Sequence, residues 1–161
     1  MVIMENELGK ILKEKNLTIA CAESCTGGLL TSKLTDVAGS SAYLQGSIVS
    51  YSNEIKNSVL KVKAETLKEF GAVSEQTARQ MSSNVRELFK TDIGVGVTGI
   101  AGPDGGSIEK PVGTVYISVS NSDKTFVKKF NFSGSRIEIK NQSCAEAMLM
   151  TIDFIKGNFY E

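Results

Sequence analysis

Apolar runs typical of strands alternate with helical patterns along the first two thirds of the chain, and this alternation constrains the fold most strongly. Runs at 17–22 and 43–51 suit buried strands, and a third strand begins at 92 and leads into a glycine-rich loop ending at 106. Helical spacing predicts helices over 26–37, over 52–60 with a loose continuation to 70, and from Ser74 to Phe89. Strands separated by helices pair in parallel through crossovers, so these segments predict an α/β fold with a parallel sheet.

The last third of the chain has a different pattern. Alternating apolar residues over 115–119 and 126–132 flank a turn sequence at 121–123 and predict an antiparallel hairpin. Helical stripes at 8–12 and 137–155 predict an opening helix and a long closing helix. The expected fold class is therefore α/β, with a mixed, mainly parallel sheet, a late antiparallel hairpin and helices on both faces. Ligands of such sheets gather at the carboxyl ends of the strands.

Length and charge limit the classes of function. With 161 residues and 41% hydrophobic content, the chain predicts one domain over 1–161. Lys and Arg total 18, as do Asp and Glu, so the formal charge is zero. A neutral chain gives no sign of a broad basic surface, and we expect neither nucleic acid nor a membrane as partner. A small neutral or zwitterionic molecule is easier to accommodate.

Targeting signals and cysteine content favour a cytoplasmic protein without a metal or cofactor. Residues 1–16 lack the apolar core of a signal peptide, and no apolar stretch reaches the ~18 residues that suggest a membrane span. Cys21, Cys25 and Cys144 form no even disulfide framework, and a reducing compartment would keep them as buried thiols. The chain contains no histidine, so we expect no transition-metal site.

The stretch AESCTGG, residues 22–28, lies at a predicted strand-to-helix turn. Ser24 is followed by Cys25, Thr26 and Gly27, whose backbone N–H groups could hold an oxyanion if the helix begins there. An ordinary helix cap made by Ser24 or Thr26 explains the same residues. A serine nucleophile needs a base, and without histidine that base would be a lysine.

Lys56 has a suitable setting for such a base. It follows Tyr51 and lies near the start of a predicted short helix, whose dipole slightly disfavours an ammonium ion. The dipole contributes only about 0.3 to 1 kcal/mol, so burial would have to supply most of the change in pKa. Most lysines are solvated, and composition alone does not single out Lys56.

Four separate blocks together resemble the CinA C-terminal-domain family. They are AESCTGG (22–28), SYSNEIK (50–56), GAVSEQTA (71–78) and TGIAGPDGGSIEKPVGTVYI (98–117), which occur in the family's order and at similar spacing. The resemblance covers nearly the whole chain and implies a three-layer α/β/α sandwich. It also implies hydrolysis of the carboxamide of nicotinamide mononucleotide to nicotinic acid mononucleotide and ammonia, within pyridine nucleotide recycling and without a cofactor. Many members carry a second, N-terminal domain, so this chain is expected to be a stand-alone form.

The resemblance also implies roles for individual residues. Ser24 matches the family's nucleophilic serine, Lys56 its lysine base, and Tyr51 a tyrosine that could relay or orient the proton. Backbone N–H groups of Cys25, Thr26 and Gly27 would stabilise the oxyanion.

The nucleotide end of the substrate is expected to meet the glycine-rich loop and an arginine. Arg136 suits bidentate contact with phosphate, and the loop glycines could place backbone amides against ribose or phosphate. These glycines are Gly99, Gly102, Gly105 and Gly106. Ser135 and Lys140 depart from the acidic residue and the arginine that family members tend to carry there, which leaves room for an altered specificity.

Two alternatives remain open at this point. In the first, Cys25 is the nucleophile and acts with Glu23 and a lysine, because a thiolate is intrinsically more nucleophilic. In the second, the domain binds a nucleotide or acts as a scaffold without turnover, in line with the family's link to competence and DNA damage. A homo-oligomer that completes its clefts across an interface is also expected.

Overall fold

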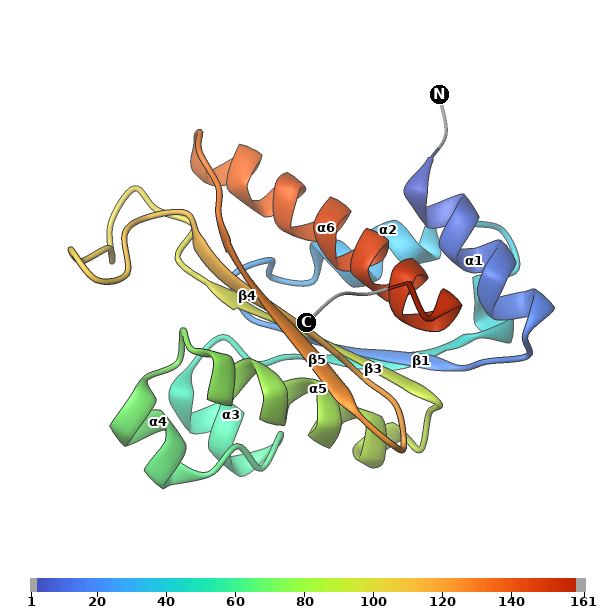
Figure 1. The fold of residues 1–161 in the computed structure, drawn as a ribbon, viewed down its shortest axis with the longest axis horizontal. Helices are drawn as coiled ribbons and strands as arrows, with labels where there is room; N and C mark the ends of the chain where they lie inside the picture. The colour runs from blue at the N-terminus through green and yellow to red at the C-terminus, as the bar shows by residue number, and fades with distance from the viewer. Residues whose placement is uncertain (1–2, 159–161) are drawn as a thin grey trace.

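The computed structural model describes residues 3–158 and shows a sheet between two layers of helices (Figure 1). Five strands lie in the order β2-β1-β3-β4-β5. Their bounds are β1 Ile19–Glu23, β2 Leu44–Val49, β3 Ile93–Gly99, β4 Thr114–Ser120 and β5 Thr125–Asn131. β1 pairs in parallel with β2 and β3, whereas β3–β4 and β4–β5 are antiparallel. The mixed sheet with its late hairpin is therefore as predicted.

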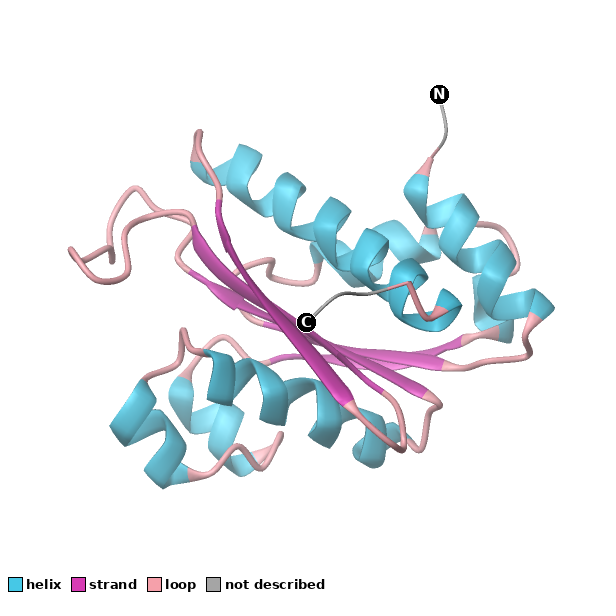
Figure 2. Cartoon of the chain, viewed as in Figure 1, coloured by secondary structure: helices cyan, strands magenta, loops and turns pink. Residues whose placement is uncertain are grey.

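The helices cover both faces of the sheet (Figure 2). One face carries α1 Met4–Glu14, α2 Leu29–Thr35 and α6 Arg136–Lys156, and the other carries α3 Asn53–Ser58, α4 Ala64–Phe70 and α5 Glu75–Phe89. A short 3-10 helix, Ser40–Ala42, precedes β2. This arrangement confirms the three-layer α/β/α sandwich. Among the described residues, no helix has the length and apolarity needed to cross a membrane.

The alternation of side chains along β1 explains why this strand is central. Every residue of β1 is buried. Ile19 and Cys21 join the core beneath α1 and α6, whereas Ala20 and Ala22 join the core beneath α5. Glu23 continues the first of these series and therefore points toward the α2 side of the sheet.

Two helix boundaries differ from the prediction. α2 begins at Leu29 rather than near residue 26, because Gly27 and Gly28 have φ values of 61° and 101° and form a turn first. The segment after residue 52 forms two helices, α3 and α4, separated at Lys61, whose φ is also 61°. The predicted cap at Ser74 is confirmed, since its Oγ accepts a hydrogen bond from the N–H of Thr77 at 3.1 Å.

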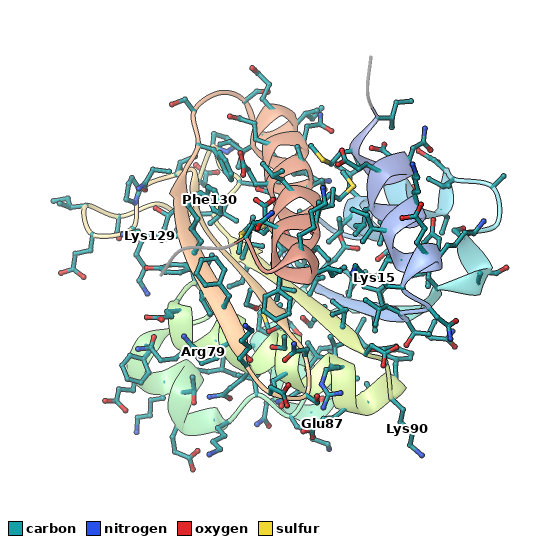
Figure 3. All side chains as sticks on the ribbon, turned by 45° about the vertical axis from the view of Figure 1, so that its right-hand side comes forward. Lys15, Arg79, Glu87, Lys90, Lys129 and Phe130 are labelled. Carbon is teal, nitrogen blue, oxygen red and sulfur yellow. The ribbon has the colours of Figure 1, made fainter. Side chains whose placement is uncertain are left out.

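The outer surface carries charges of both signs. Figure 3 shows Glu87 and Lys90 at the outer edge of the molecule, on and just after α5, whereas Arg79 of the same helix lies beside β5 and donates to Thr125 O at 3.1 Å. Lys129, on the outermost strand β5, is likewise exposed. Positive and negative side chains therefore lie close to one another on this side.

Tyr43 provides a test of the packing. Its side chain is 1% exposed, and its hydroxyl has no hydrogen-bond partner among the described residues. Removing an unpaired buried hydroxyl removes its desolvation penalty, so Tyr43→Phe should raise the free energy of unfolding by about 1 kcal/mol. Urea denaturation measures this change, with Tyr116→Phe at a half-buried site as the control. A destabilised Tyr43→Phe variant would show that the hydroxyl is hydrogen-bonded in solution.

Candidate active site

Parallel pairing brings the loops after β1, β2 and β3 to one edge of the sheet. Ser24 directly follows β1, and Ser50 directly follows β2. The side chain of Ser52 caps α3 by accepting from the N–H of Ile55 at 3.1 Å, and α3 then carries Lys56 back toward β1. As a result, Lys56 Nζ lies 2.8 Å from Ser24 Oγ, although 32 residues separate them in sequence.

Burial of Lys56 favours loss of its charge, whereas the helix dipole does not, because Lys56 lies in the last turn of α3 rather than near its start as predicted. Its side chain is 1% exposed, and no carboxylate within residues 3–158 lies within ion-pairing distance. Besides Ser24, Nζ donates to the carbonyl oxygens of Ser50 at 2.7 Å and Tyr51 at 3.4 Å. Burial lowers the pKa of Lys56 from 10.5 to about 8, so a useful fraction of the amine is neutral near physiological pH.

The turn after β1 leaves two hydrogen-bond donors beside the serine. The N–H of Ser24 donates to Val97 O at 3.0 Å, and the N–H of Gly27 donates to Ser24 O at 3.0 Å. Within the described part of the chain, the N–H groups of Cys25 and Thr26 form no hydrogen bond to another residue. These two donors can receive an oxyanion, whereas the amide of Gly27 is already used within the turn, contrary to the prediction.

The first amides of α2 are not available to a ligand. The Glu23 carboxylate accepts from the N–H groups of Gly28, Leu30 and Thr31 at 3.1, 2.9 and 2.9 Å. The unpaired amides predicted at this turn are therefore limited, among the described residues, to those of Cys25 and Thr26, and the first amides of α2 do not take part. Glu23 holds the turn and makes no hydrogen bond or ion pair to Lys56 among the described residues.

A pocket of about 230 Å³ opens in front of Ser24, here called the Ser24 pocket. Its lining includes six of the predicted site residues, namely Ser24, Cys25, Tyr51, Lys56, Gly99 and Arg136. The remaining lining residues are Asn53, Ala72, Val73, Thr98 and Ala101, none of which was predicted. All five belong to the quoted blocks SYSNEIK, GAVSEQTA and TGIAGPDGGSIEKPVGTVYI, which was the only signal that could have pointed to them.

Arg136 and Tyr51 meet at the rim of the Ser24 pocket. Arg136 Nη2 donates to Tyr51 Oη at 2.9 Å, and Nη1 donates to the carbonyl oxygen of Gly102 at 2.6 Å. Both acceptors are neutral, and no carboxylate of residues 3–158 forms an ion pair with this guanidinium group. The hydroxyl of Tyr51, a residue that is 62% exposed, is thus hydrogen-bonded to Arg136 rather than to Ser24 or Lys56. The structure does not form the proton relay predicted for it.

Gly105 and Gly106 lie outside the Ser24 pocket. They line a separate open hollow together with neighbouring residues of their own loop. A Cβ on Gly106 would lie 2.7 Å from Val112 N, and Gly105 has a φ of 93°. Both glycines are therefore needed for the loop conformation, and their contact with the nucleotide end of a ligand stays a prediction.

Cys25 is poorly suited to act as a nucleophile. Its side chain is 6% exposed, and burial raises the pKa of its thiol to about 12. The thiol therefore stays protonated near neutral pH, where only a thiolate would attack. Among residues 3–158 no hydrogen bond joins Glu23 or a lysine to Cys25, so the arrangement of Glu23, a lysine and Cys25 is not formed.

The two departures from the family pattern have separate structural settings. Ser135 caps α6 and forms a capping box with Glu138, each side chain accepting from the other's backbone N–H. Lys140 lies near the turn, with Nζ 3.8 Å from the position that a Cβ on Gly27 would occupy. Serine at 135 therefore retains a capping function in this helix.

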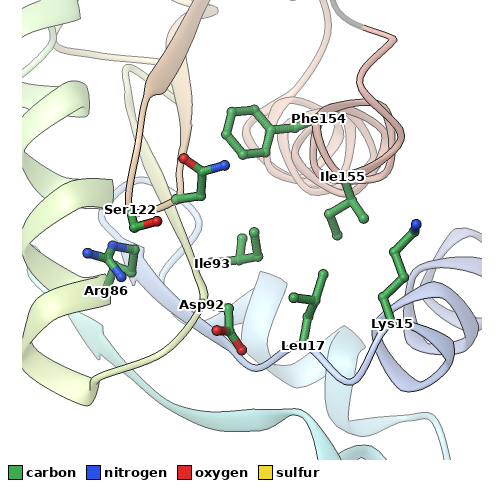
Figure 4. Close-up of a pocket in the computed structure, with 9 residues that line it drawn as sticks. Lys15, Leu17, Arg86, Asp92, Ile93, Ser122, Phe154 and Ile155 are labelled. Carbon is green, nitrogen blue, oxygen red and sulfur yellow. The ribbon is translucent and has the colours of Figure 1, made fainter.

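A larger pocket of about 480 Å³ lies at the opposite end of the sheet (Figure 4). Leu17, Ile93, Phe154 and Ile155 form its apolar wall, with Lys15, Arg86, Asp92 and Ser122 around it. Asp92 Oδ2 is hydrogen-bonded to the backbone and hydroxyl of Thr18. No pair in this pocket matches the contact between Ser24 and Lys56, so chemistry rather than volume identifies the candidate active site.

Comparison with known proteins gives a consistent assignment. The family model described as the CinA C-terminal domain matches residues 2–155. A competence-damage inducible protein of Caldanaerobacter subterraneus is 49% identical over 154 residues, which cover 96% of this chain and 37% of the relative. The chain thus spans little more than a third of the length of such curated relatives.

Solved structures match over almost their whole length. The competence/damage inducible protein of Agrobacterium tumefaciens has a TM-score of 0.92 at 37% identity, covering 95% of this chain and 93% of the other. A CinA superfamily protein of Klebsiella pneumoniae has a TM-score of 0.93 at 30% identity, covering 96% of each chain. The sequence, the fold and these relatives agree, and the chain belongs to the CinA C-terminal-domain family.

Proposed function

We propose that this domain is an amidohydrolase that converts nicotinamide mononucleotide to nicotinic acid mononucleotide and ammonia. The observation that supports this proposal most directly is the 2.8 Å contact between Lys56 Nζ and Ser24 Oγ. A serine hydroxyl is inert unless a base removes its proton, and a buried lysine with a pKa of about 8 can act as that base.

The reaction proceeds in two halves. Ser24 Oγ attacks the carboxamide carbon while its proton passes to the neutral amine of Lys56. The oxyanion formed on the carbonyl oxygen accepts from the N–H groups of Cys25 and Thr26, each worth about 2.7 to 4 kcal/mol by analogy with other oxyanion holes. Lys56 then protonates the leaving nitrogen, and the C–N bond breaks to release ammonia.

Hydrolysis of the acyl-enzyme uses the same groups. A water molecule attacks the ester carbon, Lys56 accepts its proton, and the N–H groups of Cys25 and Thr26 hold the second oxyanion. The ester bond to Ser24 breaks, and the proton on Lys56 returns to Ser24 Oγ. The product is the free carboxylic acid, and the site returns to its starting protonation state.

The size of the Ser24 pocket supports binding of one end of the substrate. Its volume of about 230 Å³ lies below the range of about 300 to 1,000 Å³ typical for whole ligands. A pyridine carboxamide is small enough for this space, and the ribose and phosphate would extend toward the rim. There Arg136, held only by neutral acceptors, can exchange them for a phosphate.

Ammonia release provides the decisive measurement. Purified protein incubated with nicotinamide mononucleotide should release ammonia and nicotinic acid mononucleotide in equal amounts. Serine, lysine and backbone amides supply every group in this mechanism, so activity should persist within about twofold after treatment with a chelator. Binding of the nucleotide without ammonia release would favour a nucleotide-binding or scaffold role instead.

A further inference from the structure

Glu23 is a buried carboxylate without a cation beside it. Its side chain is 0% exposed, and it forms no ion pair among residues 3–158. Burial of a charge is costly unless hydrogen bonds replace the water that it loses. The contacts of Glu23 therefore need an explanation.

Five hydrogen bonds to the two carboxylate oxygens provide that replacement. Oε1 accepts from Thr26 Oγ1 at 2.6 Å and from the N–H groups of Gly28 and Leu30. Oε2 accepts from the N–H and the hydroxyl of Thr31. The N-cap residue of α2 is Gly28, which has no side chain, so Glu23 caps the helix from the end of β1.

This capping decides which amides face the candidate active site. Residues 24–27 form a short loop that begins at Glu23 and is tied back to the same side chain at Thr26 and Gly28. The amides of Gly28, Leu30 and Thr31 are engaged by the carboxylate, whereas those of Cys25 and Thr26 form no hydrogen bond to another of the described residues.

We propose that Glu23 is a positioning residue for the oxyanion site of the amidohydrolase, an inference that rests on the proposed function. Through Thr26 and the first turn of α2, it fixes the loop so that two adjacent N–H groups stay beside Ser24 Oγ. It takes no proton from the substrate and touches no reacting atom. Its contribution lies in transition-state stabilisation rather than in substrate binding.

The test variant is Glu23→Gln, which keeps the length and shape of the side chain. Glutamine replaces one acceptor oxygen with an NH₂ group, a donor that would face other donors. The loop must then shift, and misplacement of a catalytic contact by about 1 Å can cost about 10²-fold in rate. We expect kcat to fall about 10²-fold while KM changes by less than about threefold.

A tetrahedral analogue separates positioning from a purely structural role. Pyridine-3-boronic acid can bond to Ser24 Oγ through boron, with the serine proton passing to Lys56, and so place a boron-bound oxygen in the oxyanion position. Calorimetry should show that Glu23→Gln weakens boronate binding by about the same factor as kcat. Affinity for nicotinic acid mononucleotide, which is planar at the reacting carbon, should stay within about threefold.

Thr31→Val is the matched control. It removes the hydroxyl that contacts Glu23 and Ser47 but keeps the Thr31 N–H. It should lower thermal stability about as much as Glu23→Gln does and leave kcat within about threefold. If Thr31→Val loses as much kcat as Glu23→Gln, general loosening of the turn explains both effects and the positioning role is overturned.

Other outcomes separate this inference from the proposed function. A Glu23→Gln enzyme that keeps its kcat and boronate affinity, or that loses boronate and product affinity equally, overturns the positioning role alone. A wild-type protein that binds the boronate but releases no ammonia contradicts the proposed function. In that case, weaker boronate binding by Glu23→Gln still supports the positioning role, and unchanged binding overturns it. A wild type that neither binds the boronate nor hydrolyses the amide overturns both.

Discussion

Replacing Ser24 with alanine is expected to lower kcat for ammonia release from nicotinamide mononucleotide by at least about 10⁴-fold, as nucleophile removal does in other acyl-transfer enzymes. Alanine removes the oxygen that lies 2.8 Å from Lys56 Nζ and, among residues 3–158, leaves no other hydroxyl hydrogen-bonded to that amine. Ser24 is buried, but alanine removes only its hydroxyl, and Lys56 keeps its two carbonyl acceptors, so the substitution should cost little stability. Binding of nicotinic acid mononucleotide should therefore persist, and the loss should appear in kcat.

Cys25→Ala supplies the matched control, because the two residues are adjacent and of similar size. The Cys25 thiol is protonated near neutral pH, since burial raises its pKa to about 12, and the backbone N–H is kept in the variant. We expect kcat to remain within about tenfold of the wild-type value, the loss reflecting a small packing defect. Ammonia release retained in Ser24→Ala but lost in Cys25→Ala would reverse the assignment of the nucleophile.

The fold could be predicted largely from the sequence, because burial leaves a continuous apolar run in strands covered on both faces and a periodic pattern in helices and hairpin strands. β1 is the clearest case, since its five residues are buried and bounded by a helix on each side. The start of α2 could not be predicted in this way. Residues 26–28 have the composition of a first helical turn, but the positive φ of Gly27 and Gly28 and the remote cap from Glu23 delay the helix.

The candidate active site could be predicted only in part. Parallel topology explains why Ser24 and Lys56 lie at the same edge of the sheet, but the resemblance to a family singled out this lysine. The walls made by Ala72, Val73 and Thr98 were missed, because small side chains carry no chemical signature in a sequence. The roles of Gly105 and Gly106 could not be predicted, since a glycine needed for a turn looks the same in a sequence as one needed for close approach to a ligand.

Replacing Lys56 is expected to cause the second large loss of activity, because its neutral amine accepts the proton of Ser24. If the neutral amine is the base, kcat/KM of the wild-type enzyme should fall about tenfold for each pH unit below about 8, the value to which burial lowers the pKa of Lys56. Lys56→Arg keeps a positive charge and several donors, but its guanidinium group does not lose a proton in this range. It should lose at least about 10³-fold in kcat at every pH between 6 and 9. A Lys56→Arg enzyme with wild-type activity would exclude Lys56 as the base.

The same pKa predicts that removal of this lysine stabilises the protein at neutral pH. The difference between about 8 in the folded protein and 10.5 for an ordinary lysine corresponds to about 3 kcal/mol of cost for holding the buried ammonium. Lys56→Met removes this cost. It also leaves the carbonyl oxygens of Ser50 and Tyr51 without their donor, which destabilises the folded protein by about 1 to 2 kcal/mol. At pH 7 the inactive variant should therefore be more stable than the wild type by about 1 to 2 kcal/mol.

The sign of this difference should change with pH. Below about 8 the folded and unfolded wild-type chains both hold the proton on Lys56, and the full cost is present. Between about 8 and 10.5 only the unfolded chain holds it, so the wild-type free energy of unfolding rises with pH, whereas methionine has no proton to release. Urea denaturation should give Lys56→Met a higher free energy of unfolding than the wild type at pH 7 and a lower one near pH 10. Lys68→Met, at an exposed position of α4, should show no such reversal. A Lys56→Met variant that is less stable than the wild type at both pH values would mean that the ammonium ion is well solvated in the folded protein, and that Lys56 is not preset to act as a base.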